Sequence, residues 1–166
     1  FNHKDKGGDF YRTTFTDLFS YVSFRIPEIS DELFKLDDGV KAGFGWQLGP
    51  FESWDALGVS TVGGMMKEMG KDIAPWVGEM IAAGCESFYK VEKGTKLYYD
   101  IPSKSYKGIP GTEKLVVLDD LRAGHTIWKN NDATIVDLGD GILNLEFHSK
   151  MNTIGAGTIA AINKAI

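Results

Sequence analysis

The stretch GFGWQLGPFESWDALG, residues 43–58, places four glycines, two tryptophans and two phenylalanines around a single glycine-proline step. Gly43 suits the end of the helical pattern before it, and Gly45 allows the backbone to turn tightly. Pro50 suits the first position of a new helix, and Glu52 then lies in the first turn, where the helix dipole favours a carboxylate. The sequence therefore predicts a sharp helix-loop-helix corner. We expect its aromatic rings to fill the angle between the two helices.

Helical periodicity surrounds this corner between residues 9 and 84. In the first predicted helix, apolar residues recur at i, i+3, i+4 and i+7 and form the stripe Phe15, Leu18, Phe19 and Val22. In the second, Ser30 is expected to cap the helix, with Ile29 and Phe34 at the spacing of a hydrophobic staple. Its buried face is expected to comprise Leu33, Leu36 and Val40.

Two further helices are predicted after the corner. Ser60 is expected to cap a short segment rich in methionine, with Met65, Met66 and Met69. The methionines either form an adaptable lipid-binding surface or, as we favour, pack against a partner domain. The next helix is expected to begin at Pro75 and to end at Gly84.

The rest of the chain changes character. The alternating stretch SFYKVEKGTKLYYD predicts a β-hairpin that turns at Gly94, and residues 101–131 have the composition of a linker, with a strand or a helical turn possible near residues 115–122. In ATIVDLGDGILNLEF, the Gly139-Asp140-Gly141 step predicts a second hairpin. A final helix is expected to follow, with Ile159, Ile162 and Ile166 at helical spacing.

Composition restricts the class of protein. The chain has 166 residues, of which 43% are hydrophobic and 25% are charged, and its net charge is -5. We expect a globular, soluble protein that lacks the basic surface of a nucleic-acid binder, a transmembrane segment and a signal peptide. The single Cys85 fits a reducing, cytoplasmic environment. A helical pattern that runs to the last residue without a terminator leads us to expect a piece of a longer polypeptide.

The corner resembles a motif of the carboxy-terminal helical domain of the 3-hydroxyacyl-CoA dehydrogenase family. The family pattern Gly-x-Gly-x-x-x-Gly-Pro-Phe-x-x-x-Asp-x-x-Gly falls here on Gly43, Gly45, Gly49, Pro50, Phe51, Asp55 and Gly58. The stretch ATIVDLGDGILNLEFHSKMNTIGAGTIAAINKAI is similar to the start of an enoyl-CoA hydratase (crotonase-like) domain. In this order, the two resemblances are those of a fused bacterial β-oxidation enzyme.

The resemblance implies a mainly α fold with three parts. Residues 1–100 are expected to form the dehydrogenase-type helical domain with its hairpin, residues 101–131 the linker, and residues 132–166 a truncated β-β-α start of the crotonase-like domain. It also implies a parent enzyme that oxidises the 3-hydroxyl group of a 3-hydroxyacyl-CoA with NAD and hydrates an enoyl-CoA. The catalytic groups and the NAD site would lie outside this chain, in a Rossmann domain and in the remainder of the hydratase. This segment would support the dehydrogenase core and the acyl-CoA cleft.

Several residues allow both a functional and a purely structural interpretation. Trp46, Phe51 and Trp54 either line an acyl tunnel or fill the core of the corner, and aromatic residues at a helix corner favour the core. Asp55 is expected to cap a neighbouring helix or to accept hydrogen bonds from backbone N–H groups rather than to act as a base. Lys150 either attracts a CoA phosphate or is solvated. His3, His125 and His148 share no metal-site spacing.

Three functions remain open at this point. The chain is an inactive middle section of a β-oxidation enzyme, a stand-alone module that binds acyl-CoA, or a structural dimerisation domain, which would make it a homo-oligomer. The resemblance favours the first.

Overall fold

The computed structural model describes residues 1–92, 94–112 and 115–166. It divides into two compact units: unit 1 comprises Phe1–Lys90 and Leu97–Ile109, and unit 2 comprises Val91–Lys96 and Pro110–Ile166. Lys93, Glu113 and Lys114, which fall within the predicted hairpin and linker, lie outside the described residues. Helices make up about half of the chain, and there are two sheets of three strands in the part that the structure describes.

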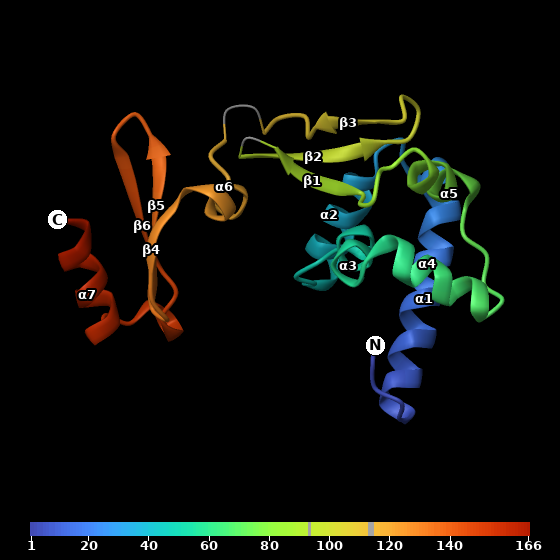
Figure 1. The fold of residues 1–166 in the computed structure, drawn as a ribbon, viewed down its shortest axis with the longest axis horizontal. Coiled ribbons are helices and arrows are strands. Elements are labelled where there is room, and N and C mark those ends of the chain that lie inside the picture. Colours follow the sequence, from blue (N-terminus) through green and yellow to red (C-terminus); the bar gives the residue numbers. More distant parts are fainter. Residues whose placement is uncertain (93, 113–114) are drawn as a thin grey trace. The chain divides into compact units, whose positions relative to one another are not determined.

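Unit 1 is a helical bundle with a small sheet (Figure 1). Its helices are α1 (Lys6–Ile29), α2 (Leu33–Phe44), α3 (Pro50–Leu57), α4 (Val59–Glu68) and α5 (Pro75–Ala82). The sheet has the order β1-β2-β3, with β1 at Tyr89–Glu92, β2 at Thr95–Asp100 and β3 at Ser105–Gly108. The end of β1 from Val91 and the start of β2 up to Lys96 are counted with unit 2. The predicted starts at Pro50 and Pro75 and the predicted hairpin are confirmed.

An aromatic core holds unit 1 together. The Trp54 ring of α3 stacks on Phe19 of α1, with centroids 5.0 Å apart and planes inclined by 11°. Phe88, just before β1, meets Trp54 edge-on at 5.2 Å and Phe51 at 5.0 Å. The Trp54 Nε1–H donates to the Val59 carbonyl at 3.3 Å, so the buried indole keeps a hydrogen bond. The core therefore joins α1 and α3 to the chain that leads into the sheet.

Several predicted helix boundaries are wrong by one or two residues. Helix α2 ends at Phe44, and Gly45 (φ 67°) is the left-handed cap, in place of Gly43. Ser30 ends α1 instead of beginning α2; its hydroxyl accepts a hydrogen bond from the Glu32 N–H at 3.2 Å. Ile29 is 62% exposed, so it forms no staple.

Two further local predictions differ from the structure. Helix α4 begins at Val59 after Gly58, whose φ of 87° favours glycine, and Ser60 lies inside the helix. Of the methionines that follow, Met66 is buried and Met69 is exposed. A single predicted Met-rich surface is therefore divided between the core and the solvent.

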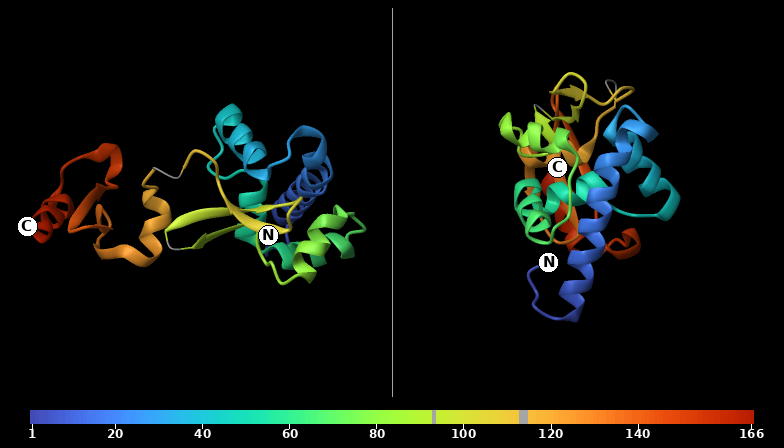
Figure 2. Two further views of the ribbon diagram at one scale, coloured as in Figure 1. Left: turned by 90° about the horizontal axis from the view of Figure 1, so that it is seen from above. Right: turned by 90° about the vertical axis from the view of Figure 1, so that its right-hand side faces the viewer.

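In its described residues, unit 2 has a three-stranded antiparallel sheet, two α-helices and a short 3₁₀ helix (Figure 2). Its elements are α6 (Leu118–His125), β4 (Thr126–Lys129), β5 (Ala133–Gly139), β6 (Ile142–Phe147), a short 3₁₀ helix η1 (Lys150–Asn152) and α7 (Ala156–Ala165). The hairpin of β5 and β6 turns through Gly139, Asp140 and Gly141, all with positive φ, as predicted. Helix α7 packs on β5 and β6 and buries Thr158 and Ala161, while Ile159 is exposed.

The stretch 101–131, which we expected to be a linker, contains regular structure. Strand β3 pairs antiparallel with β2, and Tyr106 lies opposite Tyr99. Helix α6 and strand β4 follow, and β4 pairs with β5. The prolines and glycines of this stretch therefore connect short strands. Each of these strands pairs with a neighbouring strand outside the stretch: β3 with β2, and β4 with β5.

Candidate functional site

The corner between α2 and α3 is built around one buried carboxylate. Asp37 lies on the inner face of α2 with no exposed surface. Its Oδ1 accepts a hydrogen bond from the Phe51 N–H at 2.9 Å, and its Oδ2 accepts one from the Glu52 N–H at 3.1 Å. Asp37 therefore caps the first turn of α3 from a different helix, because these N–H groups have no partner within α3. We call Asp37, Gly49, Glu52, Asp55 and Tyr89 the corner clamp.

The third donor to Asp37 comes from the sheet. The Tyr89 hydroxyl donates to Asp37 Oδ2 at 2.8 Å. Burial raises the pKa of Asp37 to about 6, although the hydrogen bonds from Phe51 and Tyr89 oppose that rise. Burial and the neighbouring Asp37 carboxylate raise the pKa of Tyr89 above its ordinary range, so the phenol remains protonated and donates.

Glu52 closes the turn from the other side. Its Oε2 accepts a hydrogen bond from the Gly49 N–H at 2.9 Å, and its Oε1 lies 3.0 Å from Lys41 Nζ. Burial alone would lower the pKa of Lys41, but hydrogen bonds to Asp38 and Glu52 outweigh it and raise that pKa. The ammonium therefore remains charged and connects the last turn of α2 to the first turn of α3.

Asp55 extends the clamp to the sheet. Its Oδ1 accepts a hydrogen bond from the Phe88 N–H at 2.7 Å, and its Oδ2 accepts one from the Tyr89 N–H at 2.8 Å. The prediction that Asp55 bonds backbone N–H groups is confirmed. The two aspartates, Asp37 and Asp55, thus tie α2, α3 and the start of β1 together. Every carboxylate oxygen of this pair is engaged in holding backbone or a tyrosine.

The four glycines of the motif differ in whether the structure requires glycine at their position. A Cβ built on Gly49 would lie 2.5 Å from the Asp37 Cα and still closer to its Cβ and Cγ, so only glycine fits there. Gly45 and Gly58 need glycine for their positive φ. Gly43, in contrast, lies inside α2 with open space around it. The corner therefore depends on three of the four glycines, each for a stated geometric reason.

The predicted ligand-contacting residues lie in different environments. Phe51 and Trp54 are fully buried in the core, whereas Trp46 is 42% exposed and Phe44 is exposed as well. The aromatic rings of the corner therefore do not all fill the angle between the helices: those of α3 do, and those of the preceding loop do not. Lys150 is exposed in η1 of unit 2. Substrate contact by Trp46, Phe51, Trp54 and Lys150 stays a prediction.

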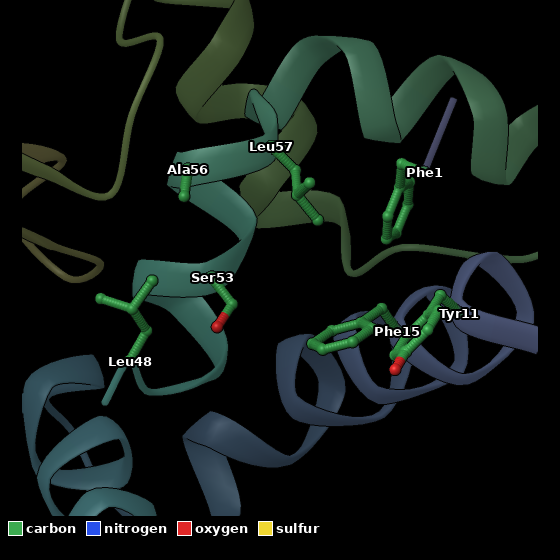
Figure 3. A pocket seen from close by; sticks show the side chains of 7 residues that line it. All are labelled: Phe1, Tyr11, Phe15, Leu48, Ser53, Ala56 and Leu57. Carbon is green, nitrogen blue, oxygen red and sulfur yellow. The ribbon is translucent and has the colours of Figure 1, made fainter. Parts of the chain in front are cut away.

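An apolar pocket opens beside the corner, between α1 and α3 (Figure 3). Its volume is about 280 Å³, and it is lined by Phe1, Tyr11, Phe15, Leu48, Ser53, Ala56 and Leu57. Figure 3 shows Phe15 and Tyr11 of α1 on one wall and Leu57, Ala56 and Ser53 of α3 on the other. Two hydroxyls, those of Ser53 and Tyr11, are the polar groups in an otherwise hydrocarbon lining. Such a site suits an apolar chain with little polar decoration.

Sequence reasoning missed Asp37, Tyr89 and this pocket. One signal for Asp37 was present, because it occupies the i+4 position of the apolar stripe that Leu33 begins. A carboxylate on a predicted buried face requires hydrogen-bond donors, and the free N–H groups of a following helix supply them. Nothing local marks Tyr89 as the third donor, since it lies 52 residues away.

The described residues contain neither a metal-binding cluster nor a membrane-spanning helix. Among residues 1–92, 94–112 and 115–166, no three His, Cys, Asp or Glu side chains are placed to hold a metal ion. Within the same ranges, none of the helices combines the length and the apolar character needed to cross a bilayer.

Comparison with known proteins gives one informative match. No family model and no solved structure matches the chain. Over 163 residues the chain is 37% identical to a protein of Bacillus subtilis (strain 168) named "Probable 3-hydroxyacyl-CoA dehydrogenase". The match covers 98% of this chain and 20% of that protein, so the chain spans about a fifth of the length of the curated relative it matches. Both units are thus similar to one segment of a protein that bears this name.

Proposed function

We propose that this chain supports the core of a 3-hydroxyacyl-CoA dehydrogenase and shapes its acyl-CoA cleft, without supplying the catalytic groups. The observation that carries the proposal is the 37% identity to the Bacillus relative across both units. The role of a support rests on the corner clamp, in which Asp37 and Asp55 are committed to backbone N–H groups. Carboxylates held in this way stabilise architecture and are poorly placed to exchange protons with a substrate.

NAD, the cofactor expected of such a parent enzyme, does not fit the corner. A dinucleotide pyrophosphate binds where a glycine-rich turn leads from a strand into a helix and presents free N–H groups. Here the glycines lie between two helices, and the Asp37 carboxylate already occupies the first N–H groups of α3. A phosphate at that place would meet a negative charge. The proposal therefore places NAD outside this chain.

The apolar pocket of unit 1 is the part of the proposal that concerns substrate. A fatty acyl chain carries no polar atoms along its length, and the Phe15, Ala56 and Leu57 walls offer none. The Ser53 and Tyr11 hydroxyls would meet the more polar end of such a ligand. We infer that this pocket, rather than the buried Phe51 and Trp54, receives the acyl chain.

The second part of the proposal concerns the identity of unit 2. We infer that β5, β6 and α7 begin a crotonase-like hydratase domain, as the resemblance implies. Two features support this: the tight hairpin at Gly139–Gly141, and the helix that follows and packs back on both strands. The hydratase chemistry, like the dehydrogenase chemistry, would require residues outside this chain.

A chimaera tests the supporting role directly. The matching fifth of the Bacillus relative is replaced by this chain, and NADH formation from a 3-hydroxyacyl-CoA is measured. We expect the chimaera to retain activity, and Gly49→Ala, which pushes α3 away from Asp37, to abolish it. Gly43→Ala is the matched control and should leave the rate unchanged. A chimaera that folds, by circular dichroism, and yet has no activity contradicts the proposal.

Measuring how acyl-CoA binds to this chain alone distinguishes the alternative functions. A stand-alone acyl-CoA module would bind acyl-CoA saturably in calorimetry whatever the outcome with the chimaera. A purely structural module would bind none. Under the proposal, binding by the isolated chain is weak and increases with acyl length, because one wall of the cleft is supplied by another domain.

A further inference from the structure

A second hollow adjoins the apolar pocket of unit 1. Its volume is about 260 Å³, and it is lined by Phe1, His3, Asp5, Gly7, Gly8 and Tyr11. Phe1 and Tyr11 line the apolar pocket as well, so the two hollows meet at these side chains. Figure 3 shows Phe1 and Tyr11 together at one end of the apolar pocket, opposite Leu48. We call the second hollow the polar hollow.

The two hollows differ in the groups that they offer to a ligand. The walls of the apolar pocket are mainly hydrocarbon. The polar hollow adds the His3 imidazole, which when neutral has one donor and one acceptor nitrogen, and the Asp5 carboxylate, which accepts. The Tyr11 hydroxyl, at the boundary, can donate and accept. A linear ligand that extends through both hollows is therefore apolar at one end and polar at the other.

The segment that carries Phe1 and His3 is held against α1. The Arg12 guanidinium donates hydrogen bonds to the carbonyl oxygens of Phe1 and His3, the second at 2.5 Å. A Cβ built on Gly8 would overlap the His3 carbonyl oxygen, so this approach requires glycine. The Phe1 ring packs edge-on against Phe15, with centroids 6.1 Å apart. The walls of both hollows are therefore in place before a ligand binds, which lowers the cost of binding.

The charges of the polar hollow favour a neutral polar group. The Asp5 Oδ1 accepts a hydrogen bond from the Gly8 N–H at 2.7 Å, and its second oxygen can accept another. Among the described residues that line the hollow, none is a lysine or an arginine. An anionic group there would meet the Asp5 carboxylate without a cationic side chain in the lining to offset it. A secondary amide has one donor and one acceptor, and Asp5 and His3 can satisfy both.

We propose that the polar hollow receives the neutral, amide-bearing arm of an acyl thioester, of the pantetheine type, while the acyl chain lies in the apolar pocket. The inference rests on the proposed function, which places the acyl chain in that pocket. Tyr11 marks the point where the hydrocarbon ends, and its hydroxyl donates to the first polar group of the arm. His3 and Asp5 then hydrogen-bond to the amide beyond it. These side chains therefore select the arm, whereas the apolar pocket selects the chain.

Three probes that share one carbon chain test the inference on the full 166-residue protein. S-dodecanoyl-pantetheine has the neutral amide arm, dodecanol has no arm, and dodecanoate ends in a charge. Calorimetry measures each affinity. We expect the pantetheine thioester to bind about tenfold more tightly than dodecanol, because its arm gains hydrogen bonds, and dodecanoate to bind no more tightly than dodecanol. Tighter binding of dodecanoate than of the thioester overturns the inference.

Two substitutions assign this preference to the polar hollow. Tyr11→Phe keeps the ring and its stacking on Phe15 but removes the hydroxyl, so the preference for the thioester over dodecanol should fall from about tenfold to about twofold. His3→Ala should reduce it in the same direction. Tyr21→Phe is the matched control, because Tyr21 is also an exposed tyrosine of α1 but lines neither hollow. A preference that is the same in all three variants contradicts the inference.

Ala56→Phe distinguishes a failure of this inference from a failure of the proposed function. It fills the apolar pocket, so it should weaken the binding of all three probes. If it does so while Tyr11→Phe and His3→Ala leave the preference intact, the acyl pocket stands and the polar hollow is wrong. If Ala56→Phe weakens none of the probes, the acyl chain lies elsewhere and both are wrong. A protein that binds none of the probes also overturns both.

Discussion

Gly49 lies directly against Asp37, and a Cβ at position 49 would come within 2.5 Å of the Asp37 Cα. This approach brings the amino end of α3 onto the inner face of α2. The Asp37 carboxylate then reaches the N–H groups of Phe51 and Glu52. Gly49 therefore allows the close approach of the two helices, and Pro50 begins α3. The carboxylates of Asp37 and Glu52 then hold the backbone of this turn in place.

Gly49→Ala tests this approach. We expect it to lower the free energy of unfolding by about 3 kcal/mol, because backbone must move to accommodate the methyl group. Gly43→Ala, at a helical position with open space, should raise it by about 0.5 kcal/mol through helix propensity. Urea unfolding followed by circular dichroism measures both. Equal stability of the two variants would show that the corner is looser than the contact with Asp37 implies.

The two tryptophans of the corner should behave differently. Trp54→Ala is expected to cost about 4 kcal/mol, because the ring is fully buried and stacks on Phe19. Trp46→Ala removes a ring that is 42% exposed and should cost less than about 1 kcal/mol. Thermal unfolding of the two variants gives the comparison. A Trp46 variant as unstable as the Trp54 variant would mean that the loop ring packs in solution.

The sequence was sufficient for features that depend on local rules. Prolines at first helical positions located α3 and α5, and glycines with positive φ located both hairpin turns. Strand β3 was missed for a physical reason. Its four residues, SYKG, have little strand character, and the strand exists because β2 offers it hydrogen bonds.

The candidate site depended on contacts between distant parts of the chain. Trp46 and Trp54 belong to one motif, yet contacts with Phe19 of α1 and with Phe88 before β1 bury Trp54 and leave Trp46 exposed. Asp37 and Tyr89 are 52 residues apart and meet only after the sheet has docked on the helices. The motif itself could be recognised from spacing, but the partners that make it rigid could not.

Filling the apolar pocket should change the preference for acyl length. Ala56→Phe places a ring into the space between α1 and α3. In the Bacillus chimaera we expect KM for long-chain substrates to rise about tenfold and KM for the shortest substrates to stay unchanged, since a lost apolar contact of this size is worth about 1–2 kcal/mol at about 25 cal/mol per Å². Ala82→Phe, on an exposed face of α5, is the control. An equal change at all lengths would place the acyl chain elsewhere.

The buried carboxylate gives unit 1 a distinctive pH dependence. Burial raises the pKa of Asp37 from 3.8 to about 6 in the folded chain, so the folded state binds this proton more tightly than the unfolded state does. Its contribution to stability is therefore complete below pH 3.8 and is lost as the pH rises through about 6. The loss amounts to about 3 kcal/mol, from about 1.36 kcal/mol for each pKa unit.

Asp37→Asn isolates this contribution, because the amide does not titrate. We expect the free energy of unfolding of the wild type, minus that of the variant, to fall steadily between pH 3.8 and about 6 and to be constant above it. Urea unfolding at a series of pH values measures the difference. Asp38→Asn removes a charge from the exposed side of the same helix and should leave the wild-type profile intact. A difference that rises with pH instead would mean that the three donors to Asp37 outweigh its burial and favour the ionised carboxylate.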